Sequence, residues 1–385
     1  MFKRVFLVVL DSLGIGQTSD QESFGDKGAN TLLHVIGESY NLDVLEKLGL
    51  MTLIGKNEEN TRGLYMRCEP LNKMKDSLNG HYEMMGAILR NPYKLYPDGF
   101  PLELISKIQH AINREVIGNV ECDGEKIIDD LGEMHIKTGA PIIYASCDSV
   151  LQVAAHEDII PVEELYDMCA KIREIVNDED YKVGRVIARP FTGKVGAFTR
   201  TNKRKDFALD PPINVIDLLS RNGVQTIAMG KISDMFNHKN IATTIKTNDN
   251  IDVMMKLTDF AKGNFDGLLW ANLNDFDSLY GHRRDREGYL KSLEEFNYYL
   301  PIFLKNLKKD DLLIITADHG CDPTFEGHDH TRELLPILIY SPIFKKGKRL
   351  THRTTLADIG ATILDNFRIK NDLGIGESIF NELRK

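Results

Sequence analysis

The sequence has 385 residues, of which 42% are hydrophobic and 27% charged, and its formal net charge is −9. This composition is that of a folded globular protein, and the length favours two domains. The acidic excess argues against a nucleic-acid-binding protein, and no run approaches the roughly 18 apolar residues that a membrane span requires. The five scattered cysteines, to which we assign no role, fit a reducing compartment. We expect a cytoplasmic protein, and a monomer is compatible with the sequence.

Short apolar runs recur near both ends of the chain, and several of them end in aspartate. All-apolar runs of this length are typical of parallel strands that are covered on both faces. Asp11, Asp277 and Asp318 each follow such a run. The predicted strands cover residues 5–10, 224–229, 267–273, 311–317 and 335–340, and an amphipathic helix covers residues 355–366. The pattern predicts an α/β fold with a doubly wound, mostly parallel sheet.

The middle of the chain departs from this rhythm. It contains three closely spaced prolines at positions 92, 97 and 101, helical patterns at residues 102–112 and 163–176, and a polar linker at residues 201–206. Prolines and polar linkers of this kind punctuate domain boundaries. We therefore predict a core domain formed by residues 1–91 and 209–385, interrupted by an inserted α+β domain of residues 92–208.

Aspartate and histidine gather at the predicted strand ends. In open α/β sheets, ligands bind at the carboxyl ends of the strands, so these side chains are expected to share one site. Carboxylate and imidazole together suit borderline divalent cations, although a single Asp-His pair is more often a cap or solvent-facing. The candidate ligands are Asp11, Asp277, His282, Asp318, His319 and His330. Six ligands are more than one ion uses, which favours two ions.

The candidate nucleophile is Ser77, in the segment Lys75 to Glu83. A serine hydroxyl is a poor nucleophile at neutral pH, but a bound divalent ion makes its attack on phosphorus feasible. An Asp-Ser pair ahead of a glycine is otherwise a common turn or helix cap. The residues alone leave both interpretations open.

At this point the chain resembles the phosphopentomutase family of the alkaline phosphatase superfamily, over nearly its whole length. No single segment is specific, but the set is. The segments that carry the resemblance are residues 9–16, 24–31, 75–77 with 80–81, 184–191, 230–234, 277–285, 316–320 and 330–333.

The resemblance implies an isomerase that interconverts ribose or deoxyribose 1-phosphate and 5-phosphate. By similarity, Asp11, Asp318, His319 and the Ser77 oxygen would hold one Mn²⁺ ion, and the second would be held by Asp277, His282 and His330. Ser77 would carry the phosphate and exchange it through a pentose 1,5-bisphosphate. A sugar bisphosphate, either ribose 1,5-bisphosphate or glucose 1,6-bisphosphate, would prime the enzyme.

The inserted domain would act as a cap that excludes water and holds the phosphate distant from the metals. Arginine suits this role because the guanidinium group binds phosphate bidentately. Six residues match the sugar-phosphate site of the family, which are Ser146, Asp148, Arg185, Ile187, Arg200 and, from the core, Lys231.

The sequence departs from the family around the nucleophile, where the usual threonine, second threonine and tryptophan are replaced by Ser77, Asn79 and Tyr82. Serine serves as nucleophile in sister families, but the loss of the second hydroxyl leaves the preferred pentose open. Three alternatives remain, which are a metal-dependent phosphomonoesterase, an independent-type phosphoglycerate mutase and a catalytically silent protein that binds metal or sugar phosphate.

Overall fold

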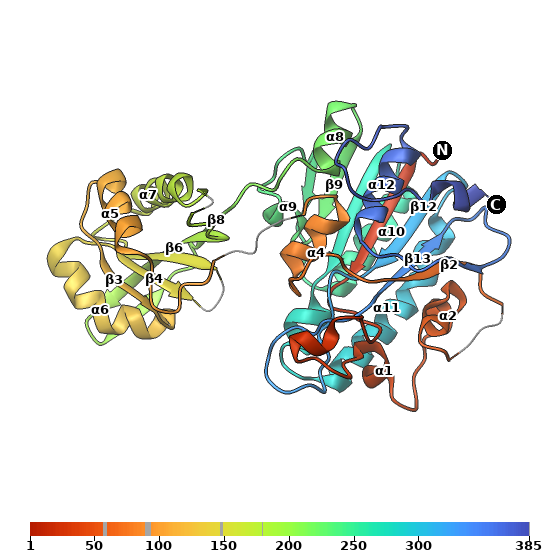
Figure 1. The fold of residues 1–385 in the computed structure, drawn as a ribbon, viewed down its shortest axis with the longest axis horizontal. Helices are drawn as coiled ribbons and strands as arrows, with labels where there is room; N and C mark the ends of the chain where they lie inside the picture. Colours follow the sequence, from red (N-terminus) through yellow and green to blue (C-terminus); the bar gives the residue numbers. More distant parts are fainter. Residues whose placement is uncertain (57–59, 89–93, 147–148, 179, 385) are drawn as a thin grey trace. The chain divides into compact units, whose positions relative to one another are not determined.

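The computed structural model describes residues 1–56, 60–88, 94–146, 149–178 and 180–384. The chain divides into two compact units (Figure 1). The core unit comprises Met1–Leu89 and Pro211–Lys385, and the insert unit, Arg90–Asp210, interrupts it. Among the described helices, none is both long enough and apolar enough to cross a membrane.

The core unit is built on one sheet, whose order is β10-β9-β11-β1-β12-β13-β2-β14. Its strands are β1 (Arg4–Leu10), β2 (Leu64–Cys68), β9 (Gln225–Met229), β10 (Thr243–Ile245), β11 (Gly267–Leu273), β12 (Asp311–Thr316), β13 (Leu335–Tyr340) and β14 (Lys348–Arg349). β13 runs antiparallel to both of its neighbours, and the other strands share the direction of β1. The predicted α/β class with a mostly parallel sheet is confirmed.

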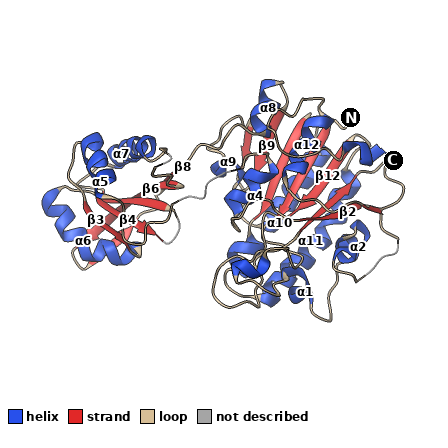
Figure 2. Ribbon diagram, in the orientation of Figure 1, coloured by secondary structure: helices blue, strands red, loops and turns tan. Residues whose placement is uncertain are grey.

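Helices cover both faces of this sheet (Figure 2). One layer packs α10 (Asn250–Lys262) against α11 (Arg286–Asn306), which also contacts α1 (Thr31–Ile36) and α2 (Asp43–Leu48). The other layer contains α4 (Ser77–Met84), α8 (Val215–Arg221), α9 (Ile232–Met235) and α12 (Ala357–Asn366). The short helix α3 (Leu50–Leu53) follows α2, and the 3-10 helices η1 (Gln21–Phe24) and η3 (Phe380–Arg384) complete the unit.

The central strands β1, β11 and β12 are buried along their whole length, which explains why their sequences are almost entirely apolar. Two charged residues are exceptions. Arg4 and Asp311 are opposite one another in the β1–β12 register, and Arg4 Nε donates to Asp311 Oδ1 over 2.7 Å. Arg4 also donates to the carbonyl oxygens of Phe260, Ala261 and Gly263. Both charges are therefore compensated in the interior.

Removal of one partner of this pair should destabilise the core unit strongly. Asp311→Ala leaves a buried guanidinium without its counter-ion, and we expect a loss of about 3–5 kcal/mol in the free energy of unfolding. The buried side chain of Trp270, the one tryptophan of the sequence, reports urea unfolding of the core unit by fluorescence. Asp259→Ala, which removes the exposed pair with Lys262, is the control and should cost less than about 1 kcal/mol. Equal effects would contradict the assignment.

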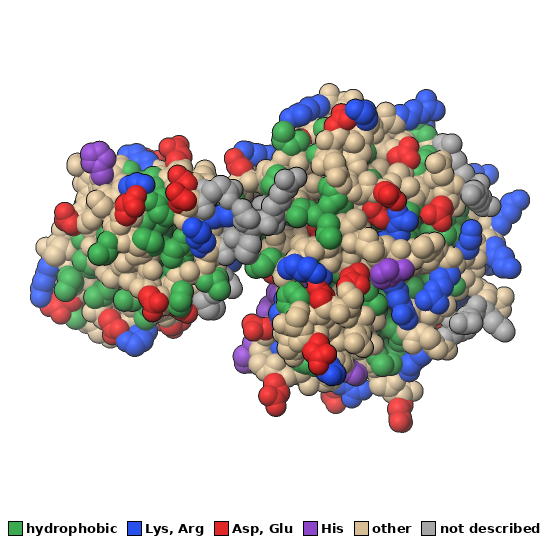
Figure 3. Space-filling view, viewed as in Figure 1, with side chains coloured by type: hydrophobic (Ala, Val, Ile, Leu, Met, Phe, Trp, Pro, Cys, Tyr) green, Lys and Arg blue, Asp and Glu red, His purple; other side chains and the backbone are tan. Residues whose placement is uncertain are grey.

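The insert unit has a sheet of order β3-β4-β5-β6-β7, with β8 also paired to β6. Its strands are β3 (Ile117–Glu121), β4 (Ile142–Ser146), β5 (Val150–His156), β6 (Arg185–Lys194), β7 (Ala197–Arg200) and β8 (Lys205–Ala208). Helices α5 (Leu102–Ile112) and α7 (Val162–Ile175) pack together on one face, and α6 (Gly124–Thr138) packs on the other. Acidic and basic side chains are interspersed on the visible surface of each unit (Figure 3).

Candidate metal centre

The carboxyl ends of three strands, one loop and the start of one helix bring the predicted ligands and nucleophile together. Asp11 follows β1, and Asp318 and His319 follow β12. Asp277 lies in a π-helix, η2 (Phe276–Gly281), directly after β11. His330 is positioned by the bridge that pairs Gly320 with Thr331, and Ser77 is the first residue of α4.

Asp11, Asp318, His319 and Ser77 form the first group. His319 Nε2 lies 3.4 Å from Asp11 Oδ1 and 3.5 Å from Asp318 Oδ2. Ser77 Oγ lies 3.1 Å from His319 Nε2 and 3.5 Å from Asp11 Oδ1. The serine hydroxyl is thus in contact with the same atoms that would bind an ion.

Asp277, His282 and His330 form the second group. The two Asp277 carboxylate oxygens lie 3.3 Å from His282 Nε2 and 3.3 Å from His330 Nε2, respectively. The rings of His319 and His330 are 3.9 Å apart between centroids, so the two groups are contiguous. The structure brings all six predicted ligands and Ser77 into one cluster.

The three imidazoles fit metal ligation. In each ring, Nδ1 faces a backbone carbonyl, which can only accept a hydrogen bond, so Nδ1 carries a proton and Nε2 is the atom left for a metal ion or a second proton. The carbonyls are those of Gly320 for His319, His328 for His282 and Lys75 for His330. The Nε2 atoms of His282 and His330 lie 3.0 Å apart. Two lone pairs facing one another at this distance call for a cation or a proton.

Two buried carboxylate oxygens add to this fit. Asp277 Oδ1 and Asp318 Oδ2 accept no hydrogen bond in the described part of the chain. Burial would raise the pKa of Asp277, but the neighbouring imidazoles of His282 and His330 lower it below its usual range. Burial lowers the pKa of His319, yet the charges of Asp318, Asp277 and Asp11 raise it to about 10, so without an ion the ring takes up a second proton on Nε2, the atom that would bind a metal. The cluster therefore attracts positive charge, as a divalent-metal site must.

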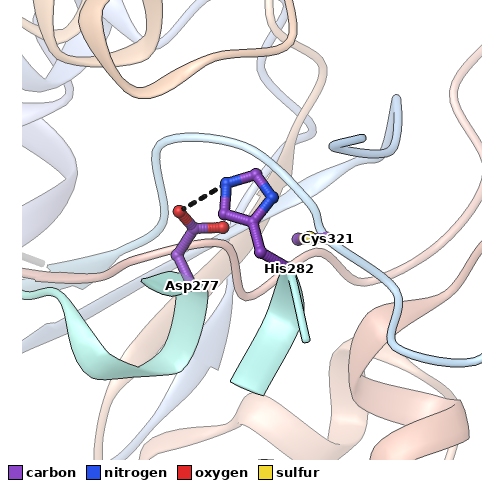
Figure 4. Close-up of side chains that lie close together, drawn as sticks. All are labelled: Asp277, His282 and Cys321. Atoms are coloured by element: carbon purple, nitrogen blue, oxygen red, sulfur yellow. Dashed lines mark ion pairs between the residues drawn. The ribbon is translucent and has the colours of Figure 1, made fainter. Parts of the chain in front are cut away.

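Cys321 also lies at the second group, although sequence reasoning assigned it no role. Its Sγ atom and one ligand atom each of Asp277 and His282 lie within 4.8 Å of one another (Figure 4). Arg284 Nη1 donates to this sulfur over 3.4 Å. Burial raises the pKa of the thiol, so Cys321 is neutral in this environment.

Lys231 and Asn272 complete the surroundings of the nucleophile. Lys231 Nζ donates to Ser77 Oγ over 2.7 Å and forms an ion pair with Asp11. Asn272, near the end of β11, donates from Nδ2 to Asp11 Oδ2 over 2.8 Å. Sequence reasoning placed Lys231 in the sugar-phosphate site and missed Asn272. A polar residue inside an otherwise apolar strand was the signal that could have found it.

The departures from the family motif have local structural roles. Asp76 is the N-cap of α4, and its carboxylate accepts hydrogen bonds from the backbone and side-chain nitrogens of Asn79. Tyr82 donates its hydroxyl to the carbonyl of Met235. Gly80 allows α4 to approach the strand end, since an added Cβ would lie 2.2 Å from the Asp318 carbonyl oxygen. Asn79 thus fixes the helix start that presents Ser77.

The predicted sugar-phosphate residues of the insert unit share one face of its sheet. Ser146 pairs with Val150, Val150 with Arg185, and Phe191 with Arg200, and residues paired in register point to the same side. Ile187 lies two residues after Arg185 and points the same way. These side chains are on the face that also carries α6. Asp148 lies outside the described residues.

The arginines of this face differ in their contacts. Arg185 forms an ion pair with Asp206 at 3.8 Å. Arg200 Nη2 donates to the Tyr144 hydroxyl over 3.3 Å, whereas Arg200 Nε is buried and has no hydrogen-bond partner among the described residues. A buried donor without an acceptor is costly, so Arg200 fits the binding of an anionic or oxygen-rich ligand.

Comparison with known proteins agrees with this arrangement. The model of the metalloenzyme superfamily matches residues 3–371, and the chain belongs to this superfamily. Membership implies divalent-metal binding, for which the clustered carboxylates and imidazoles provide the ligands.

Two solved structures share the fold at low identity, and a third is less similar. A protein from Pyrococcus horikoshii has a TM-score of 0.51 and 13% identity, with 97% of this chain and 100% of that chain covered. The phosphoglycerate mutase of Leishmania mexicana, studied at low cobalt concentration, has a TM-score of 0.50 and 14% identity, with 98% of each chain covered. A protein of the alkaline phosphatase superfamily from Vibrio parahaemolyticus has a TM-score of 0.45 and 11% identity, with 98% of this chain and 70% of that chain covered.

Proposed function

We propose that this protein is a phosphopentomutase, which interconverts ribose or deoxyribose 1-phosphate and 5-phosphate. The observation that carries the proposal is the position of Ser77 Oγ. It lies 2.7 Å from Lys231 Nζ and 3.1 Å from His319 Nε2, at the centre of the carboxylate and imidazole cluster. A hydroxyl in such surroundings is placed to accept and return a phosphoryl group.

The residues around Ser77 have different roles in this phosphoryl transfer. Lys231 donates to the serine oxygen, so its positive charge stabilises the alkoxide that attacks phosphorus. Asp11 Oδ1 and His319 Nε2 lie 3.5 Å and 3.1 Å from the serine oxygen, respectively. Asp11, Asp318 and His319 would hold one divalent ion and Asp277, His282 and His330 the other, with Mn²⁺ as the ion that the family resemblance implies. When bound, such ions neutralise the phosphate and lower the pKa of the hydroxyl.

The reaction would proceed by two transfers. Phospho-Ser77 gives its phosphoryl group to the free hydroxyl of a pentose monophosphate. The bond between phosphorus and Ser77 Oγ breaks as the new ester bond forms, and the proton of the attacking hydroxyl passes to the released serine oxygen. Ser77 then attacks the other phosphate of the pentose 1,5-bisphosphate, which releases the isomeric monophosphate. A sugar bisphosphate, ribose 1,5-bisphosphate or glucose 1,6-bisphosphate, would supply the first phosphoryl group.

A mutase must keep water from replacing the sugar as acceptor. We propose that residues of the insert unit bind the sugar phosphate tightly and so favour the sugar over water as acceptor. Arg200 and Arg185 are the principal cations of this site. The unpaired, buried Nε of Arg200 supports this assignment. Ser146, Asp148 and Ile187 would complete the site, as the family resemblance implies.

The test follows inorganic phosphate release and ribose 1-phosphate conversion in one sample, for the parent and for Arg200→Ala. A charge-assisted hydrogen bond is worth about 1.5–3 kcal/mol, so conversion should fall about ten- to a hundredfold and the ratio of hydrolysis to transfer should rise. Metal content and Ser77 phosphorylation should stay close to those of the parent. Lys194→Ala removes an exposed cation of the same unit and is the matched control.

Two outcomes would contradict the proposal. If the parent releases phosphate as fast as it isomerises the sugar, the protein is a phosphomonoesterase. If Arg200→Ala behaves like Lys194→Ala, the sugar-phosphate site lies elsewhere. The fold shared with the Leishmania mexicana phosphoglycerate mutase makes 3-phosphoglycerate the second substrate to test in the same assay. Its turnover in preference to ribose 1-phosphate would favour that mutase activity.

A further inference from the structure

A cavity of about 340 Å³ lies in the core unit, at the carboxyl ends of β9, β10 and β11. Ligands of open α/β sheets bind at these ends, and the volume lies in the range of small-molecule sites. The principal lining residues are Gly230, Lys231, Lys246, Thr247, Asn272 and Asn274. No predicted metal ligand is among the lining residues, so the cavity is distinct from the metal cluster.

The cavity begins one side chain away from the nucleophile. Lys231, which lines it, donates to Ser77 Oγ over 2.7 Å. Asn272, which also lines it, donates from Nδ2 to Asp11 Oδ2 over 2.8 Å. A molecule whose phosphate is bound at Ser77 could therefore extend its remaining atoms into this space.

Glycine at position 230 keeps the space open. An added Cβ would lie 2.9 Å from the backbone oxygen of Asn272 and 3.7 Å from Thr247 Oγ1, both of which belong to lining residues. The backbone φ of Gly230 is +81°, which also disfavours other residues. Any side chain at this position would fill the gap between Asn272 and Thr247.

One lining side chain presents an unused acceptor. Asn272 is 1% exposed, and its Oδ1 atom accepts no hydrogen bond within the described residues. Because a buried acceptor without a donor costs free energy, a ligand that donates a hydrogen bond here would be favoured. Thr247 and Asn274 add further polar residues to the lining.

The charges of the lining residues decide the class of ligand. The lining includes three aspartates, Asp234, Asp249 and Asp275, and two lysines, Lys231 and Lys246, of which Lys231 already pairs with Asp11. The net charge of the remaining lining side chains is therefore negative, which disfavours the binding of a second phosphate in this cavity. Carboxylates and amide oxygens instead accept hydrogen bonds from neutral hydroxyl groups.

We propose that this cavity binds the hydroxyl-bearing sugar part of the phosphate ester that exchanges its phosphoryl group with Ser77. This inference rests on the proposed function, and it adds a site in the core unit that forms hydrogen bonds with the sugar hydroxyls. Asn272 Oδ1 and Thr247 Oγ1 accept from the sugar, and Lys246 donates to it. The cavity is thus a determinant of specificity for sugar esters over other phosphate esters.

The test compares two esters, ribose 5-phosphate and p-nitrophenyl phosphate, which lacks sugar hydroxyls. Thr247→Val removes a hydroxyl at constant volume and should raise the KM for ribose 5-phosphate about fivefold, while the KM for p-nitrophenyl phosphate stays within about twofold. Asn248→Trp, which places a large ring at the rim, should raise the KM for the sugar ester at least about tenfold. Asn264→Trp, near the opposite end of β11, is the matched control and should leave both values unchanged.

The two proposals fail in different ways. If parent enzyme hydrolyses ribose 5-phosphate without isomerising it, the mutase assignment fails, and the comparison of KM values still tests the cavity. If the variants change the KM values for both esters equally, or change neither, the cavity does not bind the sugar. Metal content and melting temperature are measured for each variant, so that a folding defect is recognised as such.

Discussion

Replacement of Ser77 by alanine is expected to abolish phosphoryl transfer. The hydroxyl is the acceptor of the phosphoryl group in the proposed mechanism, and Lys231 and His319 contact it directly. Loss of a covalent nucleophile removes the whole pathway, so the rate should fall by at least about 10³-fold. Mass spectrometry after brief incubation with glucose 1,6-bisphosphate should find phosphoserine at position 77 in the parent and no phosphate on the corresponding peptide of the variant.

Ser77→Thr is the matched variant, because it keeps a hydroxyl at the start of α4 and installs the residue usual in the family. It should retain measurable transfer and become phosphorylated. An alanine variant that still isomerises ribose 1-phosphate would rule out the covalent route through this residue. A parent that carries phosphate at a different serine would relocate the nucleophile.

Replacement of His330 by alanine is expected to abolish binding of the metal ion at the second group of ligands. His330 Nε2 faces both Asp277 and His282, and its Nδ1 is fixed by the carbonyl of Lys75. Since even partners that only orient a ligand are worth about 10- to 100-fold in metal affinity, loss of a direct ligand should cost more than about 100-fold. Elemental analysis of manganese-saturated protein should give two ions for the parent and one for the variant.

The control for this experiment is His352→Ala, which removes an exposed histidine outside the cluster. It should bind as much metal as the parent and turn over as fast. Equal metal content in the parent and in His330→Ala would place the second ion elsewhere. Calorimetric titration of the metal-free proteins with Mn²⁺ gives the two affinities separately and resolves which site is affected.

The strands next to the site could be predicted well from the sequence. Residues 267–273 and 335–340 form β11 and β13 with the predicted bounds, and β12 covers the predicted run 311–317 except for its last residue. The reason is that a buried strand in a parallel sheet needs apolar side chains on both faces, which makes the run visible without any knowledge of its neighbours. The aspartates that follow these runs indicated the position of the metal cluster, because each one lies at the end of a strand that is easily recognised.

The pairing of the strands could not be predicted in this way. β2 escaped notice, and the apolar pattern of β13 did not show that it runs antiparallel to β12 and β2. Strand order and direction depend on which strand edges pair with one another, and an apolar run does not indicate the strand with which it pairs. The face of the insert sheet that carries Arg185 and Arg200 likewise follows from the register of β5, β6 and β7.

By itself the sequence determined the fold class and indicated which aspartates and histidines cluster, because both follow from local patterns of apolar runs and the polar residues that end them. Only the tertiary structure decided what surrounds the nucleophile. Lys231 reaches Ser77 from 154 positions away, and Asn272 reaches Asp11 from 261 positions away. Contacts at such separations arise when parallel strands align their carboxyl ends, and that alignment is a property of the assembled sheet.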